Sequence, residues 1–471
     1  MKKDSFVRLF IYSVIVRKNV SEVSTDKIKG GKIMDRLTEK FAWFAKAVNE
    51  NKVITALKDS FVVLTPFIIL ASLATLFTSL ICSPKTGLAG VAGFEWLAGY
   101  NSLFASISYG SLNIIALLIA YNMAYNMAKQ YDVEANFGGV LGLVTYVCMV
   151  PTSIAVQGAE GVFATGLSQD VTGSMGLFYA MLISGITVYI YSKLAKIKKF
   201  EIHLPDSVPA NVGKAFSSLI PTVLTVFIMC VIRFAYFSLT GNELSNLVYT
   251  VLQVPLSVIG QTPFGFLGFG FFTGLFWFFG IHGTSITGAC SKPIFLAALT
   301  KNIELVNAGQ QPTEIVTKTF NVLFGGMGGF GCTLALIVAI LVFGKREDEK
   351  AIAKMALPSA IFEINEPILF GLPIVMNAVY IIPFILAPIL GQTIGFVATK
   401  MGLMGYTYID VPWVMPPFIN AFLATGGDWR APVVQLVAFV AILLLYMPFV
   451  KLSNKVYEKQ LADQEQGAAN E

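Results

Sequence analysis

Two ionisable residues lie where the surrounding sequence is otherwise strongly apolar. His282 follows a segment rich in Phe and Gly without Asp, Glu, Lys or Arg, and Glu366 stands directly before Pro367 and another apolar run. Proline disfavours helical geometry for the preceding residue, so Glu366 is expected at a break in the chain. Ionisable side chains inside apolar segments are costly and commonly mark functional sites. An imidazole can hydrogen-bond or carry a proton there, and a carboxylate can accept hydrogen bonds from two adjacent sugar hydroxyls.

Each of these residues also has a purely structural interpretation. His282 could be a histidine whose ring is hydrogen-bonded to a backbone carbonyl inside a helix bundle, and the residues alone do not choose between this and a functional group. Glu366 could be a loop carboxylate at the membrane surface, an interpretation that suits its neighbour Glu363 better. For Glu366 we favour a functional role.

Two tryptophans are further candidates. Trp413 lies in the charge-free string VPWVMPP, whereas Trp429 lies between Asp428 and Arg430. An aromatic ring can pack on the C–H face of a pyranose, but tryptophan also anchors proteins at the membrane–water interface. We expect Trp413 to be a sugar platform and Trp429 to be an anchor.

Several common motifs are absent or lie in the wrong context. Gly326–Gly331 matches the pattern GxGxxG, but no strand–turn–helix context surrounds it, so a dinucleotide site is not expected. The pairs Gly325/Gly329 and Gly138/Gly142 fit GxxxG helix packing better. The sequence contains no GxxxxGK[ST], HExxH or CxxC motif. We therefore expect no cofactor and no metal ion.

The composition is typical of a membrane protein. The chain of 471 residues is 55% hydrophobic and 13% charged, with a mean hydropathy of +0.70, whereas a soluble domain carries roughly 25% charged residues. At about 20 residues per crossing, the chain can hold about ten crossings joined by short loops. The predicted fold class is an all-α polytopic membrane protein with about ten transmembrane helices.

The distribution of positive charge predicts the orientation. Thirteen of the 33 Lys and Arg residues lie within residues 1–58, and further basic clusters lie at 193–199 and 345–350. Cytoplasmic segments carry an excess of Lys and Arg, so we expect both termini and these loops in the cytoplasm. Nucleic-acid binding is a weaker interpretation of the N-terminal cluster, and we do not expect it.

The chain divides into four segments. Residues 1–33 form a tail that we expect not to be native, because Met34 begins a cleaner pattern. About five regular spans follow in 34–240, and the segment 241–455 is interrupted by Gly and Pro. Irregular backbone survives at membrane depth only where it lines a cavity or is buried in protein, so we place the site in 241–455. Residues 456–471 form a cytoplasmic tail, expected to be disordered from 459 onward.

Three strings carry a resemblance to a known family. GIHGTS (280–285), NEPILFGLPIV (365–375) and ATGGDWR (424–430) resemble the lactose/cellobiose-type permease subunit, EIIC, of the phosphoenolpyruvate-dependent sugar phosphotransferase system. The similarity extends over nearly the whole chain, from about Met34 to Lys455. The extended Asn-Glu-Pro string is specific, whereas the individual glycines are not.

The resemblance implies a fold and a function. It implies a ten-span homodimer in the inner membrane, with the dimer contact in the first half and the sugar site and two re-entrant hairpins in the second. A disaccharide would be phosphorylated on its C6 hydroxyl during delivery by a phosphocysteine on a separate EIIB subunit, with EIIA, HPr and enzyme I upstream. The chain alone would be a transporter, and an enzyme only together with EIIB.

The resemblance also implies residue roles. His282 and Glu366 match the family's catalytic positions near the C6 hydroxyl, Asn365 would hydrogen-bond the sugar, and Trp413 would pack on it. Which of His282 and Glu366 is the base stays open. The expected substrate is cellobiose or diacetylchitobiose, and lactose is the next candidate.

The chain departs from the family pattern at several positions. The family usually has Asn where Glu363 stands, Asn-Pro at 377–378, and small residues around Cys290 and Lys292.

Three other functions compete with this interpretation: a cation-coupled secondary sugar transporter, an enzyme acting on lipid-linked sugars and a channel-like protein. If activity depends on a phosphorylated B subunit, the protein is a phosphotransferase subunit and none of these three.

Overall fold

The computed structural model describes most of the chain. The described residues are 40, 43–44, 46–48, 50–84, 87–155, 163–200, 216–372, 374, 377 and 379–469. The expected tail 1–33 and the alternative start at Met34 lie outside them. All contacts reported below lie within the unit that begins at Val48.

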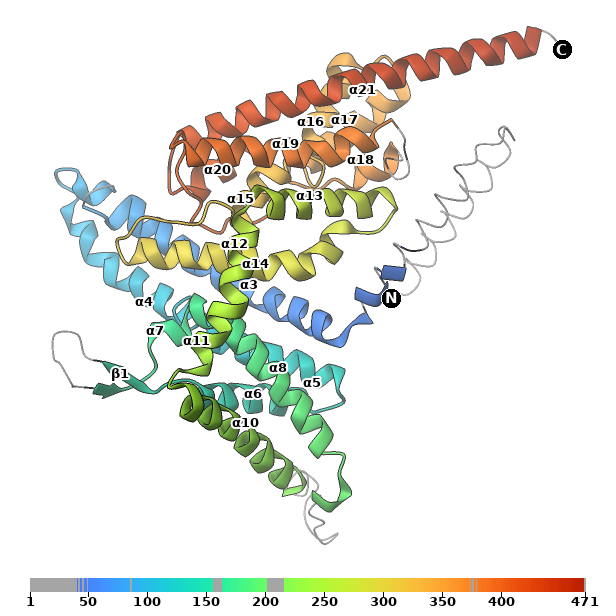
Figure 1. The fold of residues 1–471 in the computed structure, drawn as a ribbon. Helices are drawn as coiled ribbons and strands as arrows, with labels where there is room; N and C mark the ends of the chain where they lie inside the picture. Colours follow the sequence, from blue (N-terminus) through green and yellow to red (C-terminus); the bar gives the residue numbers. More distant parts are fainter. Residues whose placement is uncertain are drawn as a thin grey trace, which may run out of the picture. The chain divides into compact units, whose positions relative to one another are not determined.

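The elements before Gly241 include six helices of 11 to 26 residues, joined by short helical turns and two short strands (Figure 1). Asn51 begins the first of them, because its side chain accepts hydrogen bonds from the N–H groups of Val53 and Ile54. In chain order these elements are α3 (Lys52–Phe77), η1 (Thr78–Cys82), η2 (Leu88–Gly90), η3 (Glu95–Tyr100), α4 (Asn101–Ser111), α5 (Ile115–Gln130), α6 (Ala135–Met149), β1 (Ser153–Ala155), β2 (Phe163–Thr165), α7 (Gln169–Thr172), η4 (Ser174–Gly176), α8 (Leu177–Leu194), η5 (Lys198–Phe200) and α10 (Leu219–Thr240).

The elements after Gly241 range from five-residue helical turns to α21 (Arg430–Ala469), which has 40 residues. In chain order they are α11 (Leu244–Val248), η6 (Tyr249–Gln253), α12 (Val254–Gln261), α13 (Pro263–Phe278), α14 (Gly283–Asn307), α15 (Lys318–Gly325), α16 (Thr333–Phe343), α17 (Glu347–Ile361), α18 (Glu366–Gly371), α19 (Ile381–Lys400), α20 (Ile419–Ala424) and α21 (Arg430–Ala469).

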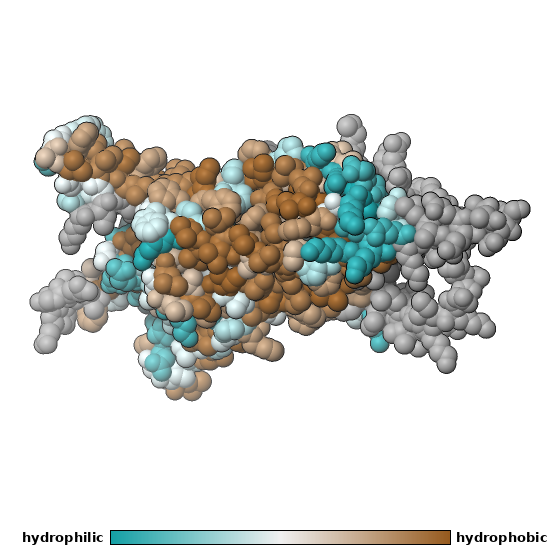
Figure 2. Space-filling model, turned by 90° about the horizontal axis from the view of Figure 1, so that it is seen from above, coloured by the Kyte–Doolittle hydropathy of each residue, from teal (hydrophilic) through white to brown (hydrophobic). Residues whose placement is uncertain are grey.

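The all-α membrane fold is confirmed. Among the described residues, six helical segments are long and apolar enough to cross a bilayer: Lys52–Cys82, Glu95–Gln130, Ser174–Leu194, Leu219–Thr240, Ile381–Lys400 and Arg430–Glu458. The pair Leu244–Gln261 and Pro263–Phe278, bent by 77°, would make a seventh, and α6 and α16 are shorter apolar helices. The expected number of about ten crossings remains a prediction. Figure 2 shows a broad hydrophobic face with hydrophilic residues toward its ends, as a protein surrounded by lipid requires.

Close packing of small residues joins α5, α6 and α8. A Cβ at Gly138 would lie 2.5 Å from the Cβ of Ala128. Gly142 packs in the same way against Ala124 and Ser184. The prediction of GxxxG packing for Gly138 and Gly142 is therefore confirmed.

Three local predictions need correction. Gly329 does not lie in a helix, so GxxxG helix packing of Gly325 and Gly329 is wrong: α15 ends at Gly325, and the following residues form a loop. The expected disorder from residue 459 is also wrong, because α21 continues to Ala469. Finally, β1 and β2 form an antiparallel hairpin with Ser153 opposite Thr165, which the sequence did not indicate.

Candidate functional site

His282 lies at the turn between α13 and α14 and caps the N-terminal end of α14. Its side chain is exposed, and its ring centroid lies 4.4 Å from that of Trp277. Nδ1 is 2.8 Å from the Ser285 hydroxyl and 3.0 Å from the Thr284 hydroxyl. These two hydroxyls orient the ring, so Nε2 is the nitrogen that a ligand would meet.

Glu366 begins α18, and Pro367 follows at the position in the first turn where proline costs least. The Glu366 side chain is exposed. Its negative charge acts on the His282 ring, as does the positive charge of Lys292 in the opposite sense. Burial lowers the pKa of His282 from its ordinary value, while a contact with its own backbone and the charge of Glu366 oppose that effect. A neutral imidazole beside a carboxylate can orient a hydroxyl and accept its proton.

Asn365 is buried and tied to a glycine-rich loop. Its Nδ2 donates to the carbonyl of Phe330 at 2.9 Å, and a Cβ at Gly329 would lie 2.6 Å from the Asn365 Cγ. The loop can approach so closely only because position 329 carries no side chain and has a φ of +91°. The amide of Asn365 is therefore fixed beside Glu366 before any ligand arrives.

Glu363 corrects a further prediction. It was expected at the membrane surface, but only 7% of its surface is exposed. Its Oε2 accepts hydrogen bonds from the N–H groups of Gly328 at 2.7 Å and Gly329 at 2.9 Å. Sequence reasoning missed this contact, although the departure from the family's usual Asn was its one visible signal.

Trp413 lies in the irregular segment between α19 and α20 and is 59% exposed. Nearby, buried Asp410 accepts a hydrogen bond from Lys318 at 2.7 Å, which ties the segment to the start of α15. Among the described residues, no contact joins Trp413 to His282, Asn365 or Glu366. Its role at the sugar stays a prediction.

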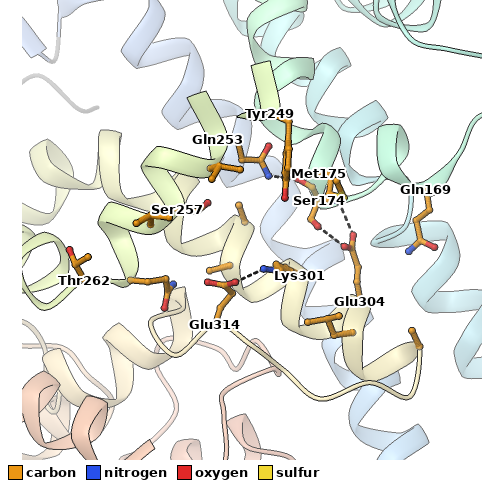
Figure 3. A pocket seen from close by; sticks show the side chains of 17 residues that line it. Gln169, Ser174, Met175, Tyr249, Gln253, Ser257, Thr262, Lys301, Glu304 and Glu314 are labelled. Atoms are coloured by element: carbon orange, nitrogen blue, oxygen red, sulfur yellow. Dashed lines mark hydrogen bonds and ion pairs between the residues drawn. The ribbon is translucent and has the colours of Figure 1, made fainter. Parts of the chain in front are cut away.

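A separate cavity of about 610 Å³ lies near the other end of α14 (Figure 3). Glu304, which lines it, is about 33 Å from His282 along a straight helix at 1.5 Å per residue. Ser174 of η4 donates to both Glu304 oxygens, from its N–H at 2.8 Å and from its hydroxyl at 2.5 Å. None of the four predicted site residues lines this cavity. We therefore take the Asn365–Glu366 turn as the candidate site, and the cavity lies elsewhere.

Comparison with known proteins places the chain in a family. The sequence profile described as "Phosphotransferase system, EIIC" matches residues 58–388. The chain belongs to this family. The resemblance found in the sequence, to the membrane permease subunit of a sugar phosphotransferase system, is thereby confirmed.

Relatives from several bacteria agree with this assignment. The chain is 30% identical to the "PTS system cellobiose-specific EIIC component" of Lactococcus lactis subsp. lactis (strain IL1403), over 88% of this chain and 97% of that protein. It is 31% identical to the "PTS system oligo-beta-mannoside-specific EIIC component" of Bacillus subtilis (strain 168), over 93% of this chain and 98% of that protein.

A solved structure has the same fold. The crystal structure of ChbC, the IIC component from an N,N'-diacetylchitobiose-specific phosphotransferase system, superimposes with a TM-score of 0.81 at 31% identity. The match covers 89% of this chain and 97% of that one. At this identity and coverage, the chain has the fold of an EIIC subunit.

Proposed function

We propose that this EIIC subunit binds a β-linked disaccharide and presents its C6 hydroxyl to the phosphocysteine of a separate EIIB subunit. Cellobiose and diacetylchitobiose are the first candidates, and lactose is a third. Relatives named for cellobiose and oligo-β-mannosides and a structural neighbour named for diacetylchitobiose support this choice. Relatives matched over 97% and 98% of their own length are named as EIIC components alone, which supports a separate B subunit.

The observation that carries the proposal is the exposed Glu366 beside a fixed Asn365, on a turn whose carboxylate acts electrostatically on the His282 ring. The sugar C6 oxygen attacks phosphorus, the S–P bond of the phosphocysteine breaks, and an O–P bond forms. The hydroxyl proton passes to Glu366 or to Nε2 of His282, and the cysteine leaves as a thiolate. Such a loose transition state needs mainly positioning and charge management, which these groups supply. Asn365 hydrogen-bonds the sugar, and Trp413 packs on it.

The setting of this reaction belongs to the same proposal. The chain lies in the inner membrane with both termini in the cytoplasm, where EIIA, HPr and enzyme I supply phosphoryl groups to EIIB. The basic segments at 193–199 and 345–350 support this orientation. Residues 34–240 serve as scaffold and dimer contact, and residues 241–455 carry the sugar.

A phosphorylation assay tests the proposal. Membrane vesicles containing this chain are mixed with phosphorylated EIIB and radiolabelled cellobiose, diacetylchitobiose or lactose. The expected product is a disaccharide 6-phosphate that forms only when EIIB is present. Accumulation of unmodified sugar without EIIB would instead mean a cation-coupled secondary transporter.

A further inference from the structure

Glu363 adopts a backbone conformation that glutamate rarely accepts. Its φ is +65°, in the left-handed region, which residues bearing a Cβ rarely adopt. The residue lies in the turn between α17 and α18, two positions before Asn365 and three before Glu366. A strained residue so near the site persists only if its surroundings hold it there.

The two oxygens of Glu363 differ sharply. Oε2 accepts both N–H groups of the glycine loop, whereas Oε1 is buried and has no hydrogen-bond partner among the described residues. An ionised carboxylate shares its charge between both oxygens, and burying one of them unpaired is costly. A neutral carboxylic acid fits the arrangement better: its carbonyl oxygen Oε2 accepts both hydrogen bonds, and the unpaired Oε1 then carries a hydroxyl, which costs less to bury than a negative charge.

The same loop residues also touch Asn365. The loop carbonyl at Phe330 accepts the Asn365 amide, and Gly329 packs against the Asn365 side chain. Glu363 and Asn365 lie on the same turn. Both therefore bind the glycine loop, at loop residues that follow one another in sequence. Loss of the Glu363 contact would leave the loop less firmly held. The positions of Asn365 and Glu366 would then be less well fixed.

We infer that Glu363 is a positioning residue which, in its neutral acid form, binds the glycine loop and thereby sets Asn365 and Glu366 for the sugar. This inference rests on the proposed function of the site and deepens it. The sugar does not contact Glu363.

The electrostatics agree with the geometry. Burial raises the pKa of Glu363 to about 8 from its ordinary value near 4.5, although the two glycine N–H groups lower it. The titratable groups around it are Cys332 at the start of α16, Glu366 on the same turn, and Tyr446 of α21, which donates to the Gly331 carbonyl. Glu363 is therefore neutral below about pH 8 and becomes ionised above it.

The pH dependence has a definite sign. Between the ordinary value and the raised value, the folded protein holds a proton that the unfolded chain has lost, so stability falls as pH rises through this window and levels off above about pH 8. Sugar binding should weaken as pH passes about 8, because ionisation leaves a charged oxygen buried without a partner.

Two variants test the inference. Glu363→Gln keeps the acceptor oxygen but cannot ionise, and Glu363→Leu removes the acceptor. Equilibrium binding of labelled cellobiose and diacetylchitobiose is measured without EIIB from about pH 6 to about pH 9.5, which brackets the expected transition. Thermal unfolding of the same samples is measured over the same range.

We expect wild-type binding to weaken above about pH 8 and Glu363→Gln to bind like the wild type at lower pH without that loss. Glu363→Leu should raise the Kd at least about tenfold at every pH. The stability of the wild type, relative to Glu363→Gln, should fall with rising pH, a readout that needs no sugar.

Other results would overturn the inference. A Glu363→Gln protein that loses binding at every pH would mean that the group acts as an anion, and one that keeps the wild-type pH dependence would place the titration elsewhere. Unchanged binding in Glu363→Leu would mean that the loop does not position the site. If the binding and unfolding patterns hold but no phosphorylation occurs, the proposed function fails while the positioning role stands.

Discussion

Glu363 and Glu304 are both largely enclosed carboxylates that receive two hydrogen bonds, yet they are held in opposite ways. Ser174 donates to both oxygens of Glu304 from its N–H and its hydroxyl. The two bonds to Glu363 come from backbone N–H groups and reach only one oxygen. The hydrogen bonds to Glu304 therefore stabilise a negative charge shared by both oxygens. The hydrogen bonds to Glu363 leave one oxygen unpaired, which favours the neutral acid.

The two contacts also differ in what they join. The partners of Glu363 lie on the loop immediately before α16, so that contact organises one site. Ser174 lies on η4, far earlier in the chain than Glu304 of α14, so that contact ties the early helices to the late ones. Gln253 strengthens this tie by donating to the Ser174 carbonyl at 3.1 Å. We therefore propose that the first region positions the groups that act on the sugar, whereas the second holds the early and late helices together.

The largest effect is expected at the site itself. Glu366→Gln and His282→Gln should each reduce EIIB-dependent sugar phosphorylation by about 100-fold or more, since a general acid–base group typically contributes 10²–10⁴-fold. Initial rates at saturating sugar measure the effect. Glu458→Gln, which alters an exposed carboxylate paired with Lys345, is the control and should keep the wild-type rate. Full turnover in Glu366→Gln would remove its role as base.

A glycine substitution tests whether the loop must approach the turn. Gly329→Ala should destabilise the protein by about 2–4 kcal/mol, from a left-handed alanine and from overpacking against Asn365. Gly402→Ala is the matched control, because its φ is +73° but nothing lies within 4 Å of the new Cβ. Thermal unfolding and sugar affinity are compared. Equal losses in the two variants would show that backbone strain alone matters.

Ser174→Ala probes the second region. It removes the hydroxyl that donates to Glu304 but leaves the N–H in place. The expected loss of stability is about 1.5–3 kcal/mol, as for hydrogen bonds to charged groups. Thermal unfolding measures it, with Ser257→Ala on the wall of the same cavity as the control. A larger effect on sugar affinity than on stability would contradict the division between the two regions.

The smallest effect is expected at Trp413. Trp413→Ala should weaken sugar binding about fivefold if the ring packs on the sugar, because an aromatic contact contributes about 0.5–1.5 kcal/mol. Trp429→Ala, at a ring that is 70% exposed, should leave affinity unchanged. Equal changes in the apparent Kd would favour an anchoring role for both rings.

The sequence predicted features that depend on long apolar runs and local spacing. Spans such as Leu219–Thr240 are apolar along their whole length, and Gly138 and Gly142 recur at a spacing that places both on one helix face. The site turn was visible because Glu366 precedes a proline inside an apolar stretch. Family resemblance then connected it to His282.

The sequence did not predict features that depend on contacts between distant segments. From the sequence, Glu363 is expected at the surface. Its partners are backbone N–H groups, which every residue except proline carries and which the sequence therefore does not indicate. The glycines at 325–331 fit helix packing equally well until their left-handed conformations are known. Glu304 gave no local signal, because its partner Ser174 lies far away in the chain.

The central claim is that the sugar binds at the Asn365–Glu366 turn and not in the cavity beside Glu304. Binding of labelled cellobiose and diacetylchitobiose to Glu366→Gln and Glu304→Gln tests it most directly, since each variant removes one charge and preserves size. The account predicts that Glu366→Gln raises the Kd at least about tenfold, while Glu304→Gln stays within about threefold of the wild type. Loss of binding in Glu304→Gln with normal binding in Glu366→Gln would contradict the account and place the sugar in the cavity.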